Sequence, residues 1–216
     1  MAGRRLYLCT PDRTDLTAFL AAAIEGGVDI VQLRDKNLEA RQIVDRARVA
    51  GRVCADHGVP LIVNDRPDLA LDAGADGVHV GQDDASPRLA RRILGSHAIV
   101  GLSTHTPAEL DASVSEPVDY VSAGPVDPTP TKPGRPGTGT PYVTYAVDRA
   151  TRPVFVTGGV TPATVPALAA AGARCFVVVR FLTESDDPRA SARALRHAIE
   201  AAVGRGADRP PRTRPA

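Results

Sequence analysis

Short runs of β-branched and other apolar residues recur along the chain, separated by stretches of helical character, and this rhythm limits the fold more than any other feature. Leu61-Ile62-Val63 and Phe176-Val177-Val178-Val179 are continuous rather than alternating, which is typical of parallel strands buried on both faces. Strands alternating with helices indicate consecutive βαβ units. The predicted strands cover residues 6–10, 29–34, 60–65, 77–81, 98–103, 119–124, 153–158 and 175–180. Eight such units predict an α/β fold, a closed (β/α)8 TIM barrel in a single domain.

The barrel accounts for residues 1–203, and the remaining segment differs in composition. Residues 204–216 are rich in Pro and Arg and lack apolar periodicity, so we expect a disordered tail. Residues 125–141 form a Pro/Gly/Thr-rich loop after the sixth strand, which we interpret as functional.

The overall charge excludes several classes of partner. The net charge is +1, from 26 Lys+Arg and 25 Asp+Glu, so no global field would draw the protein to nucleic acid or to an anionic membrane. The longest apolar runs, such as Ala18–Ile24, are shorter than the roughly 18 residues that span a bilayer. We therefore expect a cytoplasmic protein that acts on small-molecule substrates without nucleic-acid or membrane partners. The oligomeric state stays open, a homo-oligomer included.

Polar side chains gather at the C-terminal ends of the predicted strands, where active sites of such barrels lie. The second strand ends in Gln32 to Lys36, the third in Asn64-Asp65, and the fourth runs into Asp84. Ser103 lies near the end of the fifth strand, and the eighth ends at Arg180. A site for a polar, charged ligand is therefore expected at this end of the barrel.

Two acidic residues, Asp65 and Asp84, follow neighbouring strands and could hold one hard divalent cation. Mg²⁺ is usually held by one or two carboxylates together with substrate phosphates. Either acid alone could equally be a solvated loop residue or a helix cap. The cationic residues around them favour the Mg²⁺ site.

Arg34, Lys36 and Lys132 would supply positive charge for phosphate oxygens. Only two of the 26 basic residues are lysines, and both lie at predicted strand ends. If a composition bias has replaced interchangeable lysines by arginine, these two mark positions where arginine cannot serve. Chance placement is the alternative. Gln32 and Asn64 add neutral hydrogen-bond donors.

Two further segments could bind an anion. Gly158-Gly159, followed by Thr161-Pro162 at an expected helix start, has the character of a backbone-amide phosphate site, although a plain tight turn is the alternative. Thr129 and Thr131 place hydroxyl groups beside Lys132, which indicates an anion contact rather than a passive connection.

The sequence offers no convincing nucleophile and base. His79 lies on the fourth strand and is interpreted as a hydrogen-bonded barrel histidine rather than a catalyst. Cys9 has no obvious base beside it. The cysteines at 9, 54 and 175 are odd in number and far apart, so we expect reduced packing residues.

Taken together, the motifs resemble the thiamine phosphate synthase family, also called thiamine-phosphate pyrophosphorylase, over residues 5–190. The order and spacing of the motifs are jointly specific, although no single motif is. They are VQLRDK at 31–36, VNDRPDLAL at 63–71, ADGVHVGQDD at 75–84, VGLSTH at 100–105, DYVSAGPVDPTPTK at 119–132 and TGGVTPATVPALAAAGA at 157–173.

The resemblance implies a transferase of thiamine biosynthesis that uses Mg²⁺. In this reaction a thiazole phosphate displaces pyrophosphate from 4-amino-2-methyl-5-hydroxymethylpyrimidine diphosphate, and the family is thought to ionise the diphosphate first, with Mg²⁺ assisting its departure. The resemblance assigns the pyrimidine diphosphate to Gln32, Leu33, Arg34, Asp35, Lys36, Asn64, Ser103 and Lys132, of which Arg34, Lys36, Ser103 and Lys132 are the expected catalytic residues. It assigns Mg²⁺ to Asp65 and Asp84, and the thiazole phosphate to Thr129, Pro130, Thr131, Gly159, Val179 and Arg180.

One departure from the family pattern lies near the end of the eighth strand. The family commonly has Val-Ser there, whereas this chain has Val179-Arg180. The arginine could add a phosphate contact or point away. A related thiazole tautomerase, which uses no diphosphate, and a non-catalytic sensor of phosphorylated ligands are the alternatives to a synthase.

Overall fold

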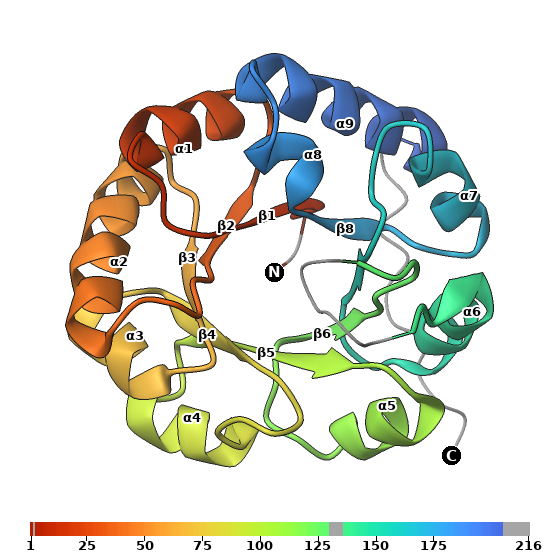
Figure 1. Ribbon diagram of the computed structural model, residues 1–216. Helices are drawn as coiled ribbons and strands as arrows, with labels where there is room; N and C mark the ends of the chain where they lie inside the picture. Colours follow the sequence, from red (N-terminus) through yellow and green to blue (C-terminus); the bar gives the residue numbers. More distant parts are fainter. Residues whose placement is uncertain (2, 130–135, 205–216) are drawn as a thin grey trace.

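In the computed structural model, which describes residue 1 and residues 3–129 and 136–204, the chain forms the expected (β/α)8 TIM barrel (Figure 1). Pro130, Thr131 and Lys132 lie outside the described residues, as does the predicted tail beyond Gly204. Within the described residues, no helix combines the length and the apolar character that a membrane span requires.

The strands follow the predicted runs closely. They are β1 Leu6–Thr10, β2 Ile30–Leu33, β3 Leu61–Asn64, β4 Gly77–Val80, β5 Ile99–Thr104, β6 Tyr120–Ala123, β7 Val154–Thr157 and β8 Cys175–Val178. The expectation that the eighth strand ends at Arg180 is wrong. Val179 leaves the extended region, with φ −126° and ψ −92°, and Arg180 is the first residue of a short helix.

Helices pack around the outside of the strands (Figure 1). The longer ones carry an apolar stripe: α2 buries Val44, Ala47, Ala50 and Cys54, a spacing that keeps one face against the barrel. The helices are α1 Leu16–Glu25, α2 Ala40–Asp56, α3 Pro67–Ala73, α4 Pro87–Leu94, α5 Pro107–Ser113, α6 Gly139–Arg149, α7 Val165–Ala170, α8 Arg180–Thr183 and α9 Pro188–Val203.

The start of α7 differs from expectation. Thr161-Pro162 was predicted to begin this helix, but the helix begins at Val165. Residues 161–164 form a preceding turn instead, in which the Thr161 backbone N–H donates to Thr164 Oγ1 at 2.9 Å.

All neighbouring strands are parallel, and β1 pairs with β8 to close the sheet, with Leu6 opposite Phe176. The main apolar core lies between the strands and the surrounding helices. A smaller cluster that includes Tyr7, Tyr120 and Phe155 fills the barrel interior. Because side chains alternate along a strand, the next inward-facing residues lie two positions further along each strand. They are therefore closer to the C-terminal ends of the strands than this cluster is.

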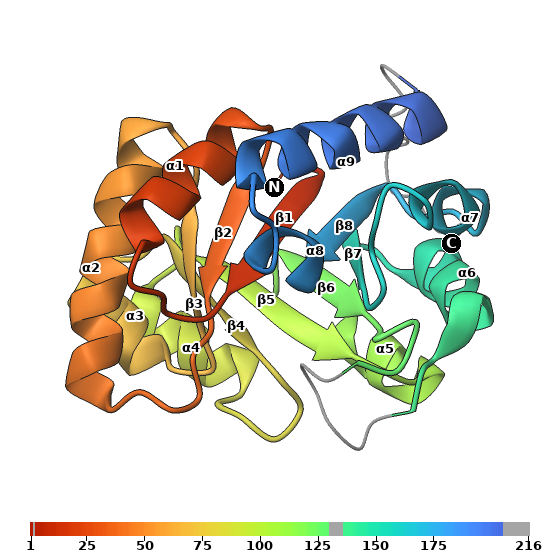
Figure 2. The ribbon, with the colours of Figure 1, turned by 45° about the horizontal axis from the view of Figure 1, so that its top comes forward.

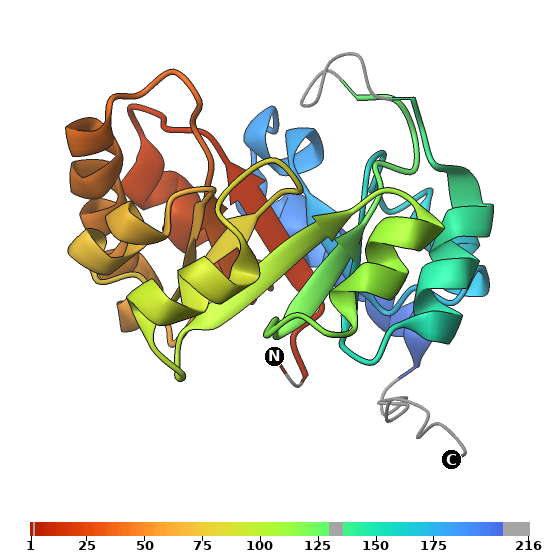
Figure 3. The same ribbon diagram turned by 90° about the horizontal axis from the view of Figure 1, so that it is seen from below.

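The two ends of the barrel have different structures. Helix α8 and the loop between β4 and α4 lie at the C-terminal end of the strands, and the N-terminus of the chain lies at the other end (Figures 2 and 3). The loops that follow the strands therefore lie together at one end of the barrel.

Candidate active site

A cavity of about 1190 Å³ opens at the C-terminal ends of the strands. Its walls include most of the residues that the sequence indicated, and these come from the second to the eighth βα units. Those that line it are Gln32, Arg34, Asp35, Lys36, Asn64, Asp65, Asp84, Ser103, Thr129, Gly159, Val179 and Arg180. This position agrees with the general rule for active sites in such barrels.

Leu33 is the one predicted residue with a different environment among those described. Its side chain is 2% exposed and packs in the apolar core between the sheet and the helices. As the residue between Gln32 and Arg34 on one strand, it faces the opposite side of the sheet from Gln32. Any contact of Leu33 with a ligand would therefore come from its backbone.

Buried polar side chains form the floor of the cavity. Gln32 is 4% exposed, Ser103 is 3% exposed and His79 is also buried. His79 is hydrogen-bonded through both ring nitrogens, to Tyr120 and to Ser103, each at 2.9 Å. The expected hydrogen bonding of His79 within the barrel is therefore confirmed.

Acidic and basic groups meet at one side of the cavity mouth. Lys36 Nζ lies 3.3 Å from Asp65 Oδ2, and Asp84 accepts a hydrogen bond from the Gly81 backbone N–H at 2.8 Å. Burial and the adjacent Asp84 carboxylate raise the pKa of Asp65, and Lys36 opposes that rise. The raised pKa means that ionising Asp65 costs free energy in the folded protein. A further positive charge beside Asp65 would therefore stabilise its ionised form.

The backbone also holds Asp65 in an unusual conformation. Its φ is 63°, in the left-handed region that only Gly, Asn and Asp adopt readily. The Asp65 N–H donates to the His79 carbonyl at 2.8 Å, which ties the β3 end to β4. This turn directs the carboxylate toward Asp84 rather than along the strand.

These residues fit a hard divalent cation. Within the described residues there is no group of three or more His, Cys, Asp or Glu side chains arranged for a metal. Two adjacent carboxylates, one of them partly buried with a raised pKa, match a Mg²⁺ ion that completes its coordination with water and substrate phosphate. Asp65 and Asp84 would hold it.

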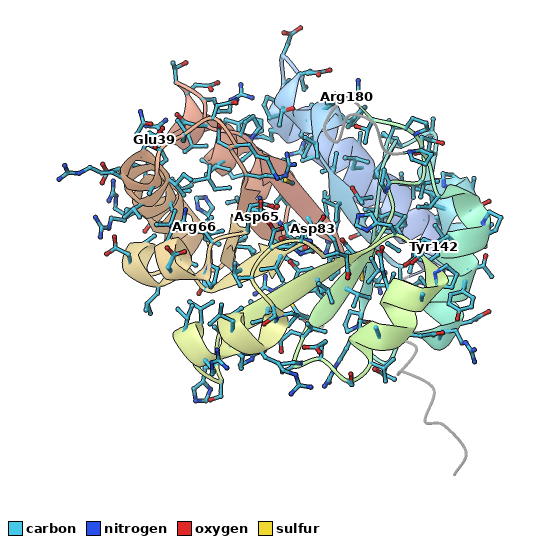
Figure 4. All side chains as sticks on the ribbon, turned by 60° about the horizontal axis from the view of Figure 1, so that its bottom comes forward. Glu39, Asp65, Arg66, Asp83, Tyr142 and Arg180 are labelled. Atoms are coloured by element: carbon cyan, nitrogen blue, oxygen red, sulfur yellow. The ribbon has the colours of Figure 1, made fainter. Side chains whose placement is uncertain are left out.

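The opposite side of the cavity is built from the β6, β7 and β8 ends. Gly158 and Gly159 have φ values of 97° and 72°, and a Cβ on Gly158 would lie 2.5 Å from the Val126 backbone N. A Cβ on Gly159 would lie 2.3 Å from the Asp127 carboxylate. The two glycines therefore allow the β7–α7 turn to pack against the β6–α6 loop. Figure 4 shows Arg180 on this side of the barrel and Asp65 on the other.

Sequence reasoning missed part of the lining. Tyr7, Cys9, Ser122 and Thr157 also face the cavity. Each lies two residues from another inward-facing residue of its strand. The alternation of side chains along a strand could therefore have predicted that these four residues face the cavity. Gln82, within the ADGVHVGQDD motif, also lines the cavity, and its Nε2 donates to the Ser103 carbonyl at 2.7 Å.

Comparison with known proteins agrees with this geometry. The sequence model of the thiamine monophosphate synthase family matches residues 6–182. A thiamine-phosphate synthase from Mycobacterium sp. (strain KMS) is 46% identical over 212 residues, covering 92% of this chain and 94% of the relative. One from Thermobifida fusca is 49% identical over 205 residues, with 92% and 94% covered.

A solved structure is similar over nearly its full length. The thiamine phosphate pyrophosphorylase from Pyrococcus furiosus superposes with a TM-score of 0.84 at 26% identity, covering 93% of this chain and 97% of its own. The sequence match and the structural match thus agree over the whole barrel, and this chain belongs to the thiamine monophosphate synthase family.

Proposed function

We propose that this protein condenses 4-amino-2-methyl-5-hydroxymethylpyrimidine diphosphate with 4-methyl-5-(2-phosphooxyethyl)thiazole to give thiamine phosphate and pyrophosphate. The observation that carries the proposal is the cluster of Asp65, Asp84 and Lys36 at the mouth of the cavity. Carboxylates for Mg²⁺ and a cation beside them are what a diphosphate requires. Family membership supports the same reaction.

In the proposed reaction the pyrimidine methylene C–O bond breaks first, and its electron pair leaves with pyrophosphate. The thiazole nitrogen then donates its lone pair to the methylene carbon and forms the C–N bond. A protein nucleophile has no role in these steps. The cavity lining includes the cations Arg34 and Lys36 and the hydroxyl groups of Ser103 and Thr129, which suit stabilisation of a departing pyrophosphate.

The side chains of this protein would stabilise charge that develops on the departing pyrophosphate. Arg34 and Lys36 line the cavity beside Asp65, and the Lys36 side chain is 60% exposed, so it can move to meet a phosphate oxygen. Lys132 is proposed to act with them. Bound Mg²⁺ would add charge neutralisation at the same oxygens. Preorganised charge of this kind lowers the barrier because it requires no reorganisation during the reaction.

The thiazole phosphate is proposed to bind at the β6 to β8 side. Thr129, Gly159, Val179 and Arg180 line that part of the cavity, and Pro130 and Thr131 follow in the sequence. Ser103 and Gln32 on the floor, with Leu33, Asp35 and Asn64, would hold the pyrimidine diphosphate. The two rings would then meet between the two sides, which supplies the alignment that a bimolecular step requires.

The test is pyrophosphate release from the two substrates. The purified protein with Mg²⁺ should release one pyrophosphate for each thiamine phosphate formed, and neither substrate alone should give product. A thiazole tautomerase would convert its thiazole substrate without any diphosphate, and a sensor would bind ligands without turnover. Either of those results would overturn the proposal.

A further inference from the structure

Buried hydrogen bonds cross the barrel interior beneath the cavity and link residues from five strands. Gln32 Nε2 donates to the Tyr7 hydroxyl at 2.6 Å, and the Tyr7 and Tyr120 hydroxyls are 2.9 Å apart. The Tyr120 hydroxyl lies 2.9 Å from His79 Nδ1, and His79 Nε2 lies 2.9 Å from Ser103 Oγ. We call these five residues the interior chain.

The bond from Gln32 to Tyr7 limits the direction of the bonds that follow it. The Tyr7 hydroxyl is buried and accepts from the Gln32 amide, and among the described residues Tyr120 is its other hydrogen-bond partner. We take Tyr7 to donate to Tyr120, because the opposite direction would leave the Tyr7 hydrogen without a protein partner, and Tyr120 then donates to His79 Nδ1. An imidazole that accepts at Nδ1 carries its hydrogen on Nε2, which then donates to Ser103. The serine oxygen thus becomes an acceptor inside the protein.

Ser103 receives a second hydrogen bond from the protein, from Ser122 Oγ at 3.5 Å. A hydroxyl has one hydrogen and two lone pairs, so two donors occupy its lone pairs and leave its hydrogen to point elsewhere. Ser103 lines the cavity. Its hydrogen is therefore available to an acceptor in the cavity.

The strands are built to allow this link. His79, Gly101 and Tyr120 lie in one row across β4, β5 and β6. A Cβ on Gly101 would lie 2.1 Å from Tyr120 Cζ and 2.5 Å from His79 Nδ1. Since Gly101 carries no side chain, the Tyr120 ring can cross its position, where it stacks on His79 with ring centroids 5.4 Å apart.

Two properties keep the interior chain in one state. Burial raises the pKa of both Tyr7 and Tyr120, so their hydroxyls stay protonated and able to donate. Edge-on packing of these rings against each other and against Phe155 restricts their motion.

We propose that Tyr7, Tyr120 and His79 are positioning residues that hold Ser103 as a hydrogen-bond donor toward an acceptor atom of the bound pyrimidine substrate. The inference rests on the proposed function for the identity of that substrate. Both tyrosines act through His79 and Ser103. Tyr120 does not touch the substrate, because its side chain is fully buried.

The first test measures the His79 tautomer in the unliganded wild-type protein. ¹⁵N NMR of the imidazoles, assigned with a His79→Asn variant, should show a neutral ring protonated at Nε2 and unprotonated at Nδ1. A ring protonated at Nδ1 would reverse the hydrogen bonds that link Tyr120, His79 and Ser103 and overturn the proposal. The tautomer is read from the wild-type protein without catalysis, and the variant serves only to assign the His79 signals.

The second test removes one hydroxyl. Tyr120→Phe should weaken binding of the pyrimidine diphosphate, measured by calorimetry without the thiazole substrate, by about 10-fold, because Ser103 is no longer held as a donor. The Michaelis constant for thiazole phosphate should not change. Tyr142→Phe is the matched control, since Tyr142 is a buried tyrosine on the outer helix α6, away from Asp65 (Figure 4).

A third arm separates positioning from a general loss of stability. In a Ser103→Ala background, Tyr120→Phe should cause no further loss of affinity, because the group through which it acts is gone. An additive loss, or wild-type affinity in Tyr120→Phe alone, would overturn the proposal. If the wild-type protein fails to bind the pyrimidine diphosphate at all, the proposed function fails instead, and the tautomer still tests the interior chain.

Discussion

At the residue scale, the two lysines give the sharpest prediction. A compact ammonium can approach one diphosphate oxygen in a crowded site, whereas a planar guanidinium needs more space and a bidentate partner. Lys36→Arg and Lys132→Arg should each lower kcat by roughly 10- to 1,000-fold, by analogy with loss of one preorganised donor. Steady-state kinetics at saturating Mg²⁺ measures this, with circular dichroism as the folding control.

The reverse exchange provides the matched control for the lysines. Arg92 is exposed on α4, away from the cavity, so Arg92→Lys should leave kcat unchanged. If both lysine variants turn over at the wild-type rate, the two lysines carry no special role and the argument from composition fails.

The negative charge of Asp65 should lower the stability of the fold although Mg²⁺-dependent activity requires it. Its folded-state pKa is raised, mainly by burial and then by Asp84. The contribution of Asp65 to stability is therefore fully present below the ordinary carboxyl pKa and is lost as pH rises through the raised value. Asp65→Asn keeps a residue that tolerates φ 63° and removes the charge. At neutral pH without Mg²⁺, this variant should melt at a higher temperature than wild type.

The same variant should lose Mg²⁺-dependent activity, which separates the two effects. Asp45→Asn, an exposed change on α2, should alter neither property. A melting temperature of Asp65→Asn below that of wild type, at neutral pH in excess EDTA, would show that ionised Asp65 stabilises the fold after all.

At the element scale, two glycines should respond to alanine in opposite directions. A Cβ on Gly77 in β4 would lie 2.0 Å from the Ile99 carbonyl oxygen of the neighbouring strand, so Gly77→Ala should destabilise the barrel by about 1–3 kcal/mol or more. Gly51 lies within α2, and its nearest neighbour would be Leu61 Cδ2 at 3.6 Å. Gly51→Ala should stabilise the protein by about 0.5–1 kcal/mol through helix propensity. Urea unfolding measures the free energy of unfolding of both variants. Equal changes in that free energy would refute the packing argument.

Helix α8 carries the second prediction at this scale. Arg180, its first residue, lines the cavity where the family pattern has a serine. If its side chain contacts the thiazole phosphate, Arg180→Ala should raise the Michaelis constant for that substrate by about 10-fold and leave that for the pyrimidine substrate unchanged. Small, equal changes in both constants would place the side chain outside the site.

At the scale of the whole molecule, Mg²⁺ and pyrophosphate should each strengthen the binding of the other. The protein offers two carboxylates to the ion, so Mg²⁺ alone should raise the melting temperature little. Mg²⁺ with inorganic pyrophosphate should stabilise the fold by about 2.7 kcal/mol at 100 times Kd. EDTA should abolish the effect, and differential scanning fluorimetry measures it. Equal stabilisation by pyrophosphate with and without Mg²⁺ would show that the ion does not bind with pyrophosphate at this site.

The barrel was predictable from sequence because each buried strand leaves its own short apolar run, and the structure confirms every one. The end of the eighth strand was predicted less well. Val179 leaves the extended region, but it is apolar like the strand residues before it, so the apolar run does not show where the strand ends. The polar residues of the cavity wall were found because they follow the strands directly. The interior chain was not, because its members belong to five strands whose relative register no local pattern encodes.

The pairing of β1 with β8 has a consequence for how the protein is made. The first strand to leave the ribosome must wait for almost the whole chain to be synthesised before its second neighbour exists. At about 5–20 residues per second, that interval lasts on the order of ten seconds or more. During it, the nascent sheet has two open edges that can pair with other chains. Molecules caught in this interval, rather than finished barrels, are where we expect chaperones to act.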